Sequence, residues 1–100
     1  MKVSITEALK IGVKAIQDGE TDRAQRIFAT IRVTQPDNPE ANFNLGELAL
    51  GLGESKDALS YLDRAFKVEP NRAKFRISYI DALIKNDQLE KANQLLTEGK

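Results

Sequence analysis

The sequence predicts an all-α fold, an α-solenoid of three helix-turn-helix hairpins with six helices. Three observations predict it: the chain is self-similar at an interval of about 34 residues, apolar residues recur at helical spacing on both sides of a turn in each interval, and glycine and proline interrupt the pattern at the same phase. We therefore expect a single domain over residues 1–100, with units at 5–38, 39–72 and 73–100, the last of them incomplete.

The repeat becomes visible when the sequence is shifted against itself so that residue 5 lies on residue 39. The residues brought together are Gly12 with Gly46, Gly19 with Gly53, Ala24 with Ala58, Pro36 with Pro70 and, after a second shift, Ala58 with Ala92. A period of this size is typical of stacked supersecondary units.

The first unit shows how each hairpin is predicted. Ala8, Ile11 and Ala15 recur at three- and four-residue spacing and predict its first helix. The stretch "DGET" ends that helix, and Thr21 is expected to cap the second helix. The apolar positions of the second helix are Ala24, Ile27, Phe28 and Ile31. The prolines of "QPDNP" then end it and start the next unit.

The second and third units repeat this order. In the second, the turn is "GLGES" with Ser55 as the expected cap, and in the third it is "KNDQ". The apolar positions of the second unit are Leu45, Leu48 and Ala49, then Ala58, Leu59, Leu62 and Ala65. Those of the third unit are Tyr79, Ile80 and Leu83, then Leu89, Ala92, Leu95 and Leu96.

A helical hairpin of about 34 residues, with glycine at its eighth position, alanine at its twentieth, a large apolar residue at its twenty-fourth and proline at its thirty-second, resembles the tetratricopeptide repeat. Counted from residues 5, 39 and 73, these positions hold Gly12, Ala24, Phe28 and Pro36, then Gly46, Ala58, Leu62 and Pro70, then Ile80, Ala92 and Leu96. The resemblance covers residues 5–100 and implies a right-handed superhelix whose first helices line a concave, partner-binding groove.

The sequence departs from that family at two positions of the unit. The fourth position, usually aromatic in the family, holds Ala8, Asn42 and Arg76, which is expected to loosen that contact. The eighth position, usually small, holds Ile80 in the third unit. We therefore expect the third hairpin to pack differently from the other two.

The composition argues against an enzyme. The chain has no cysteine and no histidine, so the usual neutral-pH base, the usual zinc ligands and the strongest nucleophile are absent. The glycines of "GLG" lack the strand and third glycine of a dinucleotide loop. Glu47 and Asp81 could form an acid/base pair, but nothing indicates a substrate pocket. We expect no catalysis, no cofactor and no metal.

The charges are balanced, with fifteen basic and fifteen acidic residues. No strong field is therefore expected to attract nucleic acid or an anionic membrane. One basic stretch, at residues 64–76, is interpreted as a solvated helix end because acidic residues flank it. The sequence has no signal-peptide core and no apolar window long enough to span a membrane, which predicts a soluble, cytoplasmic protein.

Each predicted first helix carries more apolar residues than one packing stripe needs. The same shift arranges them in two apolar ladders, Leu9, Phe43 and Ile77 and then Ile16, Leu50 and Ile84, with a middle ladder of Val13, Glu47 and Asp81. Two interpretations remain open. Either these residues line a partner-binding groove, or the apolar ladders pack against neighbouring first helices.

The resemblance also bears on the kind of partner. Family members that bind acidic chaperone C-termini use lysine, asparagine and arginine in the groove. The corresponding residues here are Leu9, Val13, Glu47, Ile77 and Asp81. The resemblance therefore implies that an acidic tail is not the ligand, and we expect an apolar or mildly basic protein segment, for example an amphipathic helix.

Arrays of this family usually close with an extra polar helix, and residue 100 is reached before one could form. Leu89 and Leu96 are then expected to remain open for self-association or for docking to further domains of a longer chain. The segment from residue 78 to residue 100 also resembles repeat segments upstream of bacterial transferase domains. The sequence thus predicts a protein-interaction module, or alternatively a non-catalytic arm of a larger enzyme or a self-associating scaffold.

Overall fold

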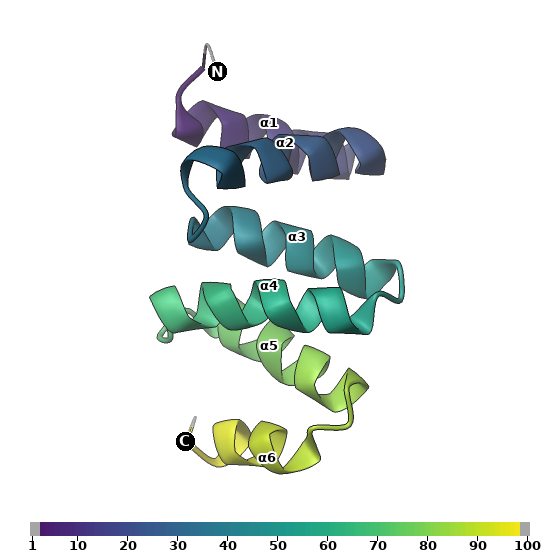
Figure 1. Ribbon diagram of the computed structural model, residues 1–100, viewed down its shortest axis with the longest axis vertical. Helices are drawn as coiled ribbons and strands as arrows, with labels where there is room; N and C mark the ends of the chain where they lie inside the picture. Colours follow the sequence, from purple (N-terminus) through teal and green to yellow (C-terminus); the bar gives the residue numbers. More distant parts are fainter. Residues whose placement is uncertain (1–2, 99–100) are drawn as a thin grey trace.

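The computed structural model describes residues 3–98, and its three helical hairpins follow one another along the long axis, with the two termini at opposite ends (Figure 1). The six helices are α1 (Ile5–Gln17), α2 (Thr21–Thr34), α3 (Pro39–Gly51), α4 (Ser55–Val68), α5 (Ala73–Lys85) and α6 (Leu89–Glu98). Both the first and the second helices of the hairpins therefore begin at a constant interval along the chain. Residues 3–98 contain no strand, and the predicted all-α solenoid is confirmed.

The turn inside each hairpin has the same backbone geometry. Gly19 and Gly53 have φ angles of 76° and 77°, and Asp87, at the equivalent position of the third hairpin, has a φ of 61°. Glycine adopts this left-handed conformation without steric cost, and aspartate is among the few other residues that tolerate it. The backbone N–H that comes next then bonds a carbonyl five residues back, at 2.8 to 2.9 Å in all three turns.

The expected caps of the second helices are wrong. Thr21 and Ser55 are the first residues inside α2 and α4, and the N-cap positions are occupied by Glu20 and Glu54, whose side chains make no capping hydrogen bond. The turn itself explains the difference. Because the N–H of Glu20 bonds the Ala15 carbonyl, the glutamate takes the half-helical position and the hydroxyl residue falls inside the helix.

Glycine allows the two helices of a hairpin to approach each other. A Cβ atom added at Gly12 would lie 2.6 Å from Cζ of Phe28, and one added at Gly46 would lie 2.5 Å from Cγ of Leu62. Both large side chains are fully buried. The small residue at the eighth position therefore leaves the space that the large residue at the twenty-fourth position fills.

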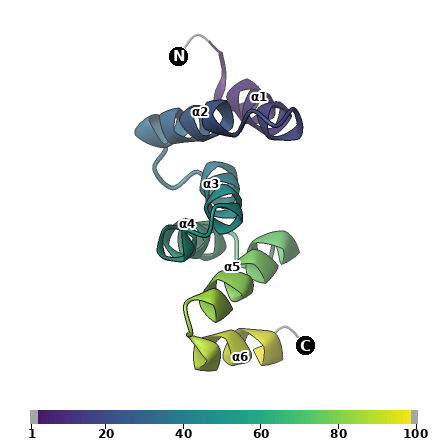
Figure 2. The same ribbon diagram turned by 90° about the vertical axis from the view of Figure 1, so that its right-hand side faces the viewer.

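The third hairpin packs differently, as the sequence predicts. Ile80 stands where the other hairpins have glycine, and the Leu96 side chain, equivalent to Phe28 and Leu62, is 53 % exposed. Helix α6 instead buries Leu95, the preceding residue, together with one alanine. Figure 2 shows α5 and α6 at this end of the stack.

Asn42 replaces the aromatic residue that the family usually has at the fourth position of the second unit. It is fully buried, and its side-chain NH₂ donates to the carbonyls of Pro36 (3.0 Å) and Asn38 (3.1 Å). The connection between the first and second hairpins is therefore held by hydrogen bonds from α3.

The core consists of two clusters, and each joins two hairpins. The first cluster contains Ala8, Ala15, Ala24, Phe28 and Ile31 of the first hairpin with Ala41 and Leu45 of α3. The second contains Ala49, Ala58 and Leu62 of the second hairpin with Tyr79, Ile80, Ala82, Leu83, Ala92 and Leu95 of the third. Because the core crosses hairpin boundaries, each hairpin depends on its neighbour for burial.

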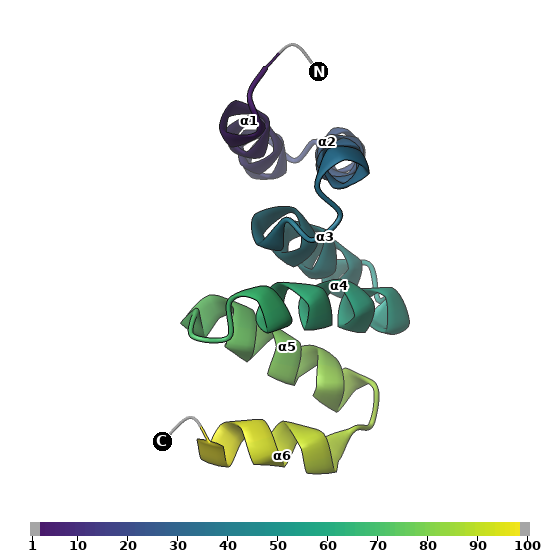
Figure 3. The same ribbon diagram turned by 60° about the vertical axis from the view of Figure 1, so that its left-hand side comes forward.

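The first helices form one side of the stack. The backbones of α1 and α3 approach each other, as do those of α3 and α5, whereas in residues 3–98 the backbones of successive second helices do not. The arrangement of the hairpins can be followed in Figure 3. We call the side formed by α1, α3 and α5 the inner face.

Candidate functional site

The inner face carries the nine residues that the sequence singles out, in two different environments. Leu9, Ile16, Phe43 and Leu50 are half-buried and pack against the core clusters. Ile77, by contrast, is 66 % exposed, and Ile84 is also exposed. On α1 and α3 these side chains thus lie against core residues of both the first and the second helices, while on α5 the same positions remain open to solvent.

The middle ladder points away from the core. Val13 and Glu47 are exposed, and Asp81 is half-buried. The Lys85 ammonium contacts both carboxylate oxygens of Asp81 at 3.1 Å. A partner that approaches this face would thus meet one apolar side chain, one carboxylate without an ion pair among the described residues, and one carboxylate paired with lysine.

A hollow lies where α1 faces the start of α3. It has a volume of about 440 Å³ and is lined by Thr6, Leu9, Lys10, Val13, Lys14, Gln17 and Glu40. Leu9 and Val13 supply its apolar surface, and Lys10 and Lys14 supply positive charge beside it. The hollow thus combines two of the sequence-predicted residues with polar groups from the same helix.

Aromatic rings and cations meet on the inner face between α3 and α5. The rings of Phe43 and Phe75 lie 5.0 Å apart between centroids. The Lys74 ammonium lies 4.9 Å from the centroid of Phe43, and the Arg72 guanidinium lies 4.2 Å from that of Phe75. Such pairs contribute beyond the area they bury, since the faces of the rings attract cations.

Glu40 connects these cations to α3. Its carboxylate forms ion pairs with Arg72 and with Lys74, the latter at 3.6 Å. Partial burial alone would lower the pKa of Arg72, but hydrogen bonds to Glu40 and Glu69 outweigh burial and raise the pKa. Arg72 therefore stays charged while it joins α3 to the connection before α5.

Sequence reasoning missed this cluster because it interpreted residues 64–76 as a solvated helix end. The structure places each cation of that stretch against a specific partner. Arg64 pairs with Asp37, Lys67 with Asp63, Arg72 and Lys74 with Glu40, and the Arg76 guanidinium donates to the Leu95 carbonyl. The alternation of cations with Phe75 in "NRAKF" is the signal that could have indicated the cluster.

A second polar contact joins α4, α5 and α6. The Tyr79 hydroxyl donates to Oδ1 of Asp63 at 2.8 Å, and the Lys91 ammonium lies 5.6 Å from the centroid of the Tyr79 ring. Burial raises the pKa of Asp63, but the hydrogen bonds from Tyr79 and Lys67 outweigh it, so the pKa lies below its usual value. Burial and the Asp63 carboxylate raise the pKa of Tyr79.

Across residues 3–98, no three acidic, cysteine or histidine side chains converge in a way that could hold a metal ion. None of the helices in that part of the chain is both long and apolar enough to cross a membrane.

Comparison with sequence families identifies the repeat. One tetratricopeptide repeat profile matches residues 9–65, and a second matches residues 49–100. No curated protein matches the chain.

Solved structures show the same fold at low sequence identity. MamA from Desulfovibrio magneticus RS-1 superimposes with a TM-score of 0.78 and 22 % identity, over 90 % of this chain and 51 % of that one. The Yersinia enterocolitica type III secretion translocator chaperone SycD gives 0.78 and 15 %, over 92 % and 70 %. A Thermobaculum terrenum O-GlcNAc transferase mutant gives 0.80 and 24 %, over 97 % and 19 %. The chain thus spans about half the length of the MamA chain in that structure.

Proposed function

The chain belongs to the tetratricopeptide repeat family, and on that premise we propose that it is a protein-interaction module whose inner face binds an apolar or mildly basic segment of a partner protein. The module itself has no catalytic activity and needs no cofactor. The observation that carries the proposal is the apolar surface that Leu9 and Val13 give the hollow, together with the middle ladder that continues to the exposed Glu47 and the half-buried Asp81. Because Lys10 and Lys14 flank the hollow, the apolar part of the segment would lie there and its basic part at Glu47.

The chemistry of the inner face supports the kind of partner. Val13, Ile77 and Ile84 offer exposed apolar surface, and Glu47 is a carboxylate for which a lysine or arginine of the partner could provide the counter-ion. An amphipathic helix with one apolar stripe and a basic flank has both features. The name of one structural neighbour, a translocator chaperone, is in keeping with a protein ligand.

A display library of helical peptides, selected on the immobilised chain, tests this function. Val13→Asp should weaken the selected peptides at least tenfold, because it places a charge on the apolar part of the inner face. Glu47→Gln should weaken those peptides that carry lysine or arginine. Both residues are exposed, so the variants should fold normally.

Val33→Asp is the matched control, because Val33 lies on α2, away from the inner face, and is 83 % exposed. Binders that tolerate Val13→Asp as well as they tolerate Val33→Asp would place the site elsewhere. A library that yields no binder would contradict a peptide-binding function.

A second candidate function is that of a non-catalytic arm in a larger enzyme. The superposition on the O-GlcNAc transferase favours this candidate, since it covers 97 % of this chain but only 19 % of the transferase chain. The amino-acid sequence of the full-length gene product discriminates between the two functions, because this candidate requires a catalytic domain in the same polypeptide.

A further inference from the structure

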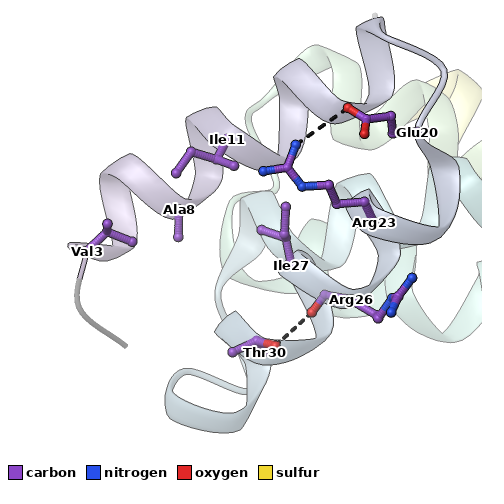
Figure 4. A pocket seen from close by; sticks show the side chains of 8 residues that line it. All are labelled: Val3, Ala8, Ile11, Glu20, Arg23, Arg26, Ile27 and Thr30. Atoms are coloured by element: carbon purple, nitrogen blue, oxygen red, sulfur yellow. Dashed lines mark hydrogen bonds and ion pairs between the residues drawn. The ribbon is translucent and has the colours of Figure 1, made fainter.

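A groove lies between α1 and α2 at the N-terminal end of the stack, on a different surface from the inner face (Figure 4). It has a volume of about 660 Å³ and is lined by Val3, Ala8, Ile11, Glu20, Arg23, Arg26, Ile27 and Thr30. The aliphatic side chains of α1 and α2 form its apolar part. Arg23 extends from α2 toward Glu20, with Nη1 3.5 Å from the carboxylate.

The same groove exists in the other two hairpins, where it is filled. The positions of Ile11 and Ile27 are taken in the second hairpin by Leu45 and Tyr61, which pack in one cluster with Phe28 of α2. In the third hairpin they are taken by Tyr79 and Leu95, which pack in one cluster with Leu62 of α4. In both cases the second helix of the preceding hairpin packs here through the shared cluster, with its backbone next to the first helix of the hairpin.

Helix α6 is the second helix of the third hairpin, and its apolar outer surface is exposed. Leu96, at the repeat position of Phe28 and Leu62, is 53 % exposed, and Leu89 is 58 % exposed. Within residues 3–98 no further helix packs on α6 in the way that α3 packs on α2 or α5 on α4. The groove and the helix that would fill it are therefore open at opposite ends of the same molecule (Figure 1).

We propose that α6 of one copy of this chain occupies the groove between α1 and α2 of a second copy, so that copies stack head to tail and Leu96 packs against Ile11. The occupant is a second copy because the interface repeats the two hairpin interfaces already present within the chain. The two surfaces that meet, the groove and α6, are different, so the contact is heterologous. Every assembly therefore keeps one free groove and one free α6.

The polar residues around Tyr79 have counterparts at the two ends of the chain. Within the chain, Asp63 of α4 and Lys91 of α6 both lie at Tyr79, with opposite charges. In the stack, Arg23 would take the position of Lys91. Thr97 would take that of Asp63, so the stack would have a hydroxyl where the chain has a carboxylate.

The stack would reproduce only part of the internal interface. Glu7 and Lys14 stand on α1 where the second hairpin has Ala41 and Leu48, both of which pack in the first core cluster. These polar residues lie one helical turn to either side of Ile11, on the same stripe of α1, so α6 would meet apolar surface of α1 chiefly at Ile11. The apolar contact is therefore smaller than the one inside the chain, and we expect association at high protein concentration.

Light scattering across a concentration series tests the stack with two blocked variants. Ile11→Glu blocks the groove, and Leu96→Glu blocks α6. The mass of the wild type should rise with concentration, whereas each variant alone should associate at least tenfold more weakly. An equimolar mixture of the two should form a dimer and nothing larger, because it contains one intact groove and one intact α6.

Val33→Glu is the matched control and should associate like the wild type, and circular dichroism checks that each variant is folded.

A wild type that stays monomeric at all concentrations would overturn the proposal. So would an Ile11→Glu variant that associates like the wild type while Leu96→Glu does not, because the C-terminal ends would then pair with each other. Neither result bears on peptide binding at the inner face, since that assay uses different residues.

Discussion

The two glycines of α3 show how strongly a single residue position can depend on its surroundings. Gly46 faces α4, and an added Cβ atom would lie 2.5 Å from Cγ of Leu62. At Gly51, the last residue of the same helix, an added Cβ atom would meet nothing within 4 Å beyond its chain neighbours and the backbone of its own helix. The same substitution in one helix therefore tests packing at the first position and helix propensity at the second.

Gly46→Ala should lower the free energy of unfolding by about 1 to 3 kcal/mol, because the buried Leu62 side chain must move and overpacking outweighs the better helix propensity of alanine. Gly51→Ala should leave stability unchanged or raise it by up to about 1 kcal/mol. Urea unfolding followed by circular dichroism measures both. A Gly46→Ala protein as stable as the Gly51→Ala protein would contradict the close approach of α3 and α4.

At the scale of the elements, the contact between Asp63 and Tyr79 ties α4 to α5. The pKa of Asp63 is lowered from 3.8 in the folded chain, so its ionised form stabilises the fold above that pH and this contribution is lost as the pH falls through the lowered value. The pKa of Tyr79 is raised from 10.0, so its neutral form stabilises the fold below pH 10 and this contribution is lost at higher pH.

Tyr79→Phe removes the hydrogen bond and should lower the free energy of unfolding at pH 7 by about 1 kcal/mol. It should also reduce the loss of stability below pH 4 and above pH 10 relative to the wild type. Thermal melts from pH 3 to pH 11 measure these changes. Tyr61→Phe is the control, since the structure gives the Tyr61 hydroxyl no side-chain hydrogen bond among the described residues. Parallel pH profiles for the wild type and Tyr79→Phe would contradict the role of this pair.

The elements could be predicted from the sequence wherever the period repeats. The helices, the turns and the packing glycines follow from residues that recur at the repeat interval, such as Gly12 and Gly46. The caps could not be predicted, because Thr21 and Ser55 suit both the N-cap and the first helical position, and only the turn geometry decides between them.

At the scale of the whole molecule, the sequence placed the candidate residues on one face but could not say which of them the fold would cover. Phe43 and Ile77 occupy the same repeat position, yet Phe43 packs on Phe75 and Ile77 is largely exposed. The difference depends on the neighbours that the superhelix brings to each position. The groove beside Ile11 could not be predicted for the same reason, since in the sequence its apolar residues form an ordinary helical packing stripe.

The small buried area of α6 also bears on the order in which the molecule opens. Because α6 buries only Ala92 and Leu95, while α3 contributes to both core clusters, the stack has a weak last element and a strong middle. Amide protons of α6 should therefore exchange with deuterium faster than those of α3 and α4, in a local opening that leaves the first four helices intact. Hydrogen exchange followed by mass spectrometry would show this, and uniform protection across all six helices would mean that the solenoid opens as a single unit.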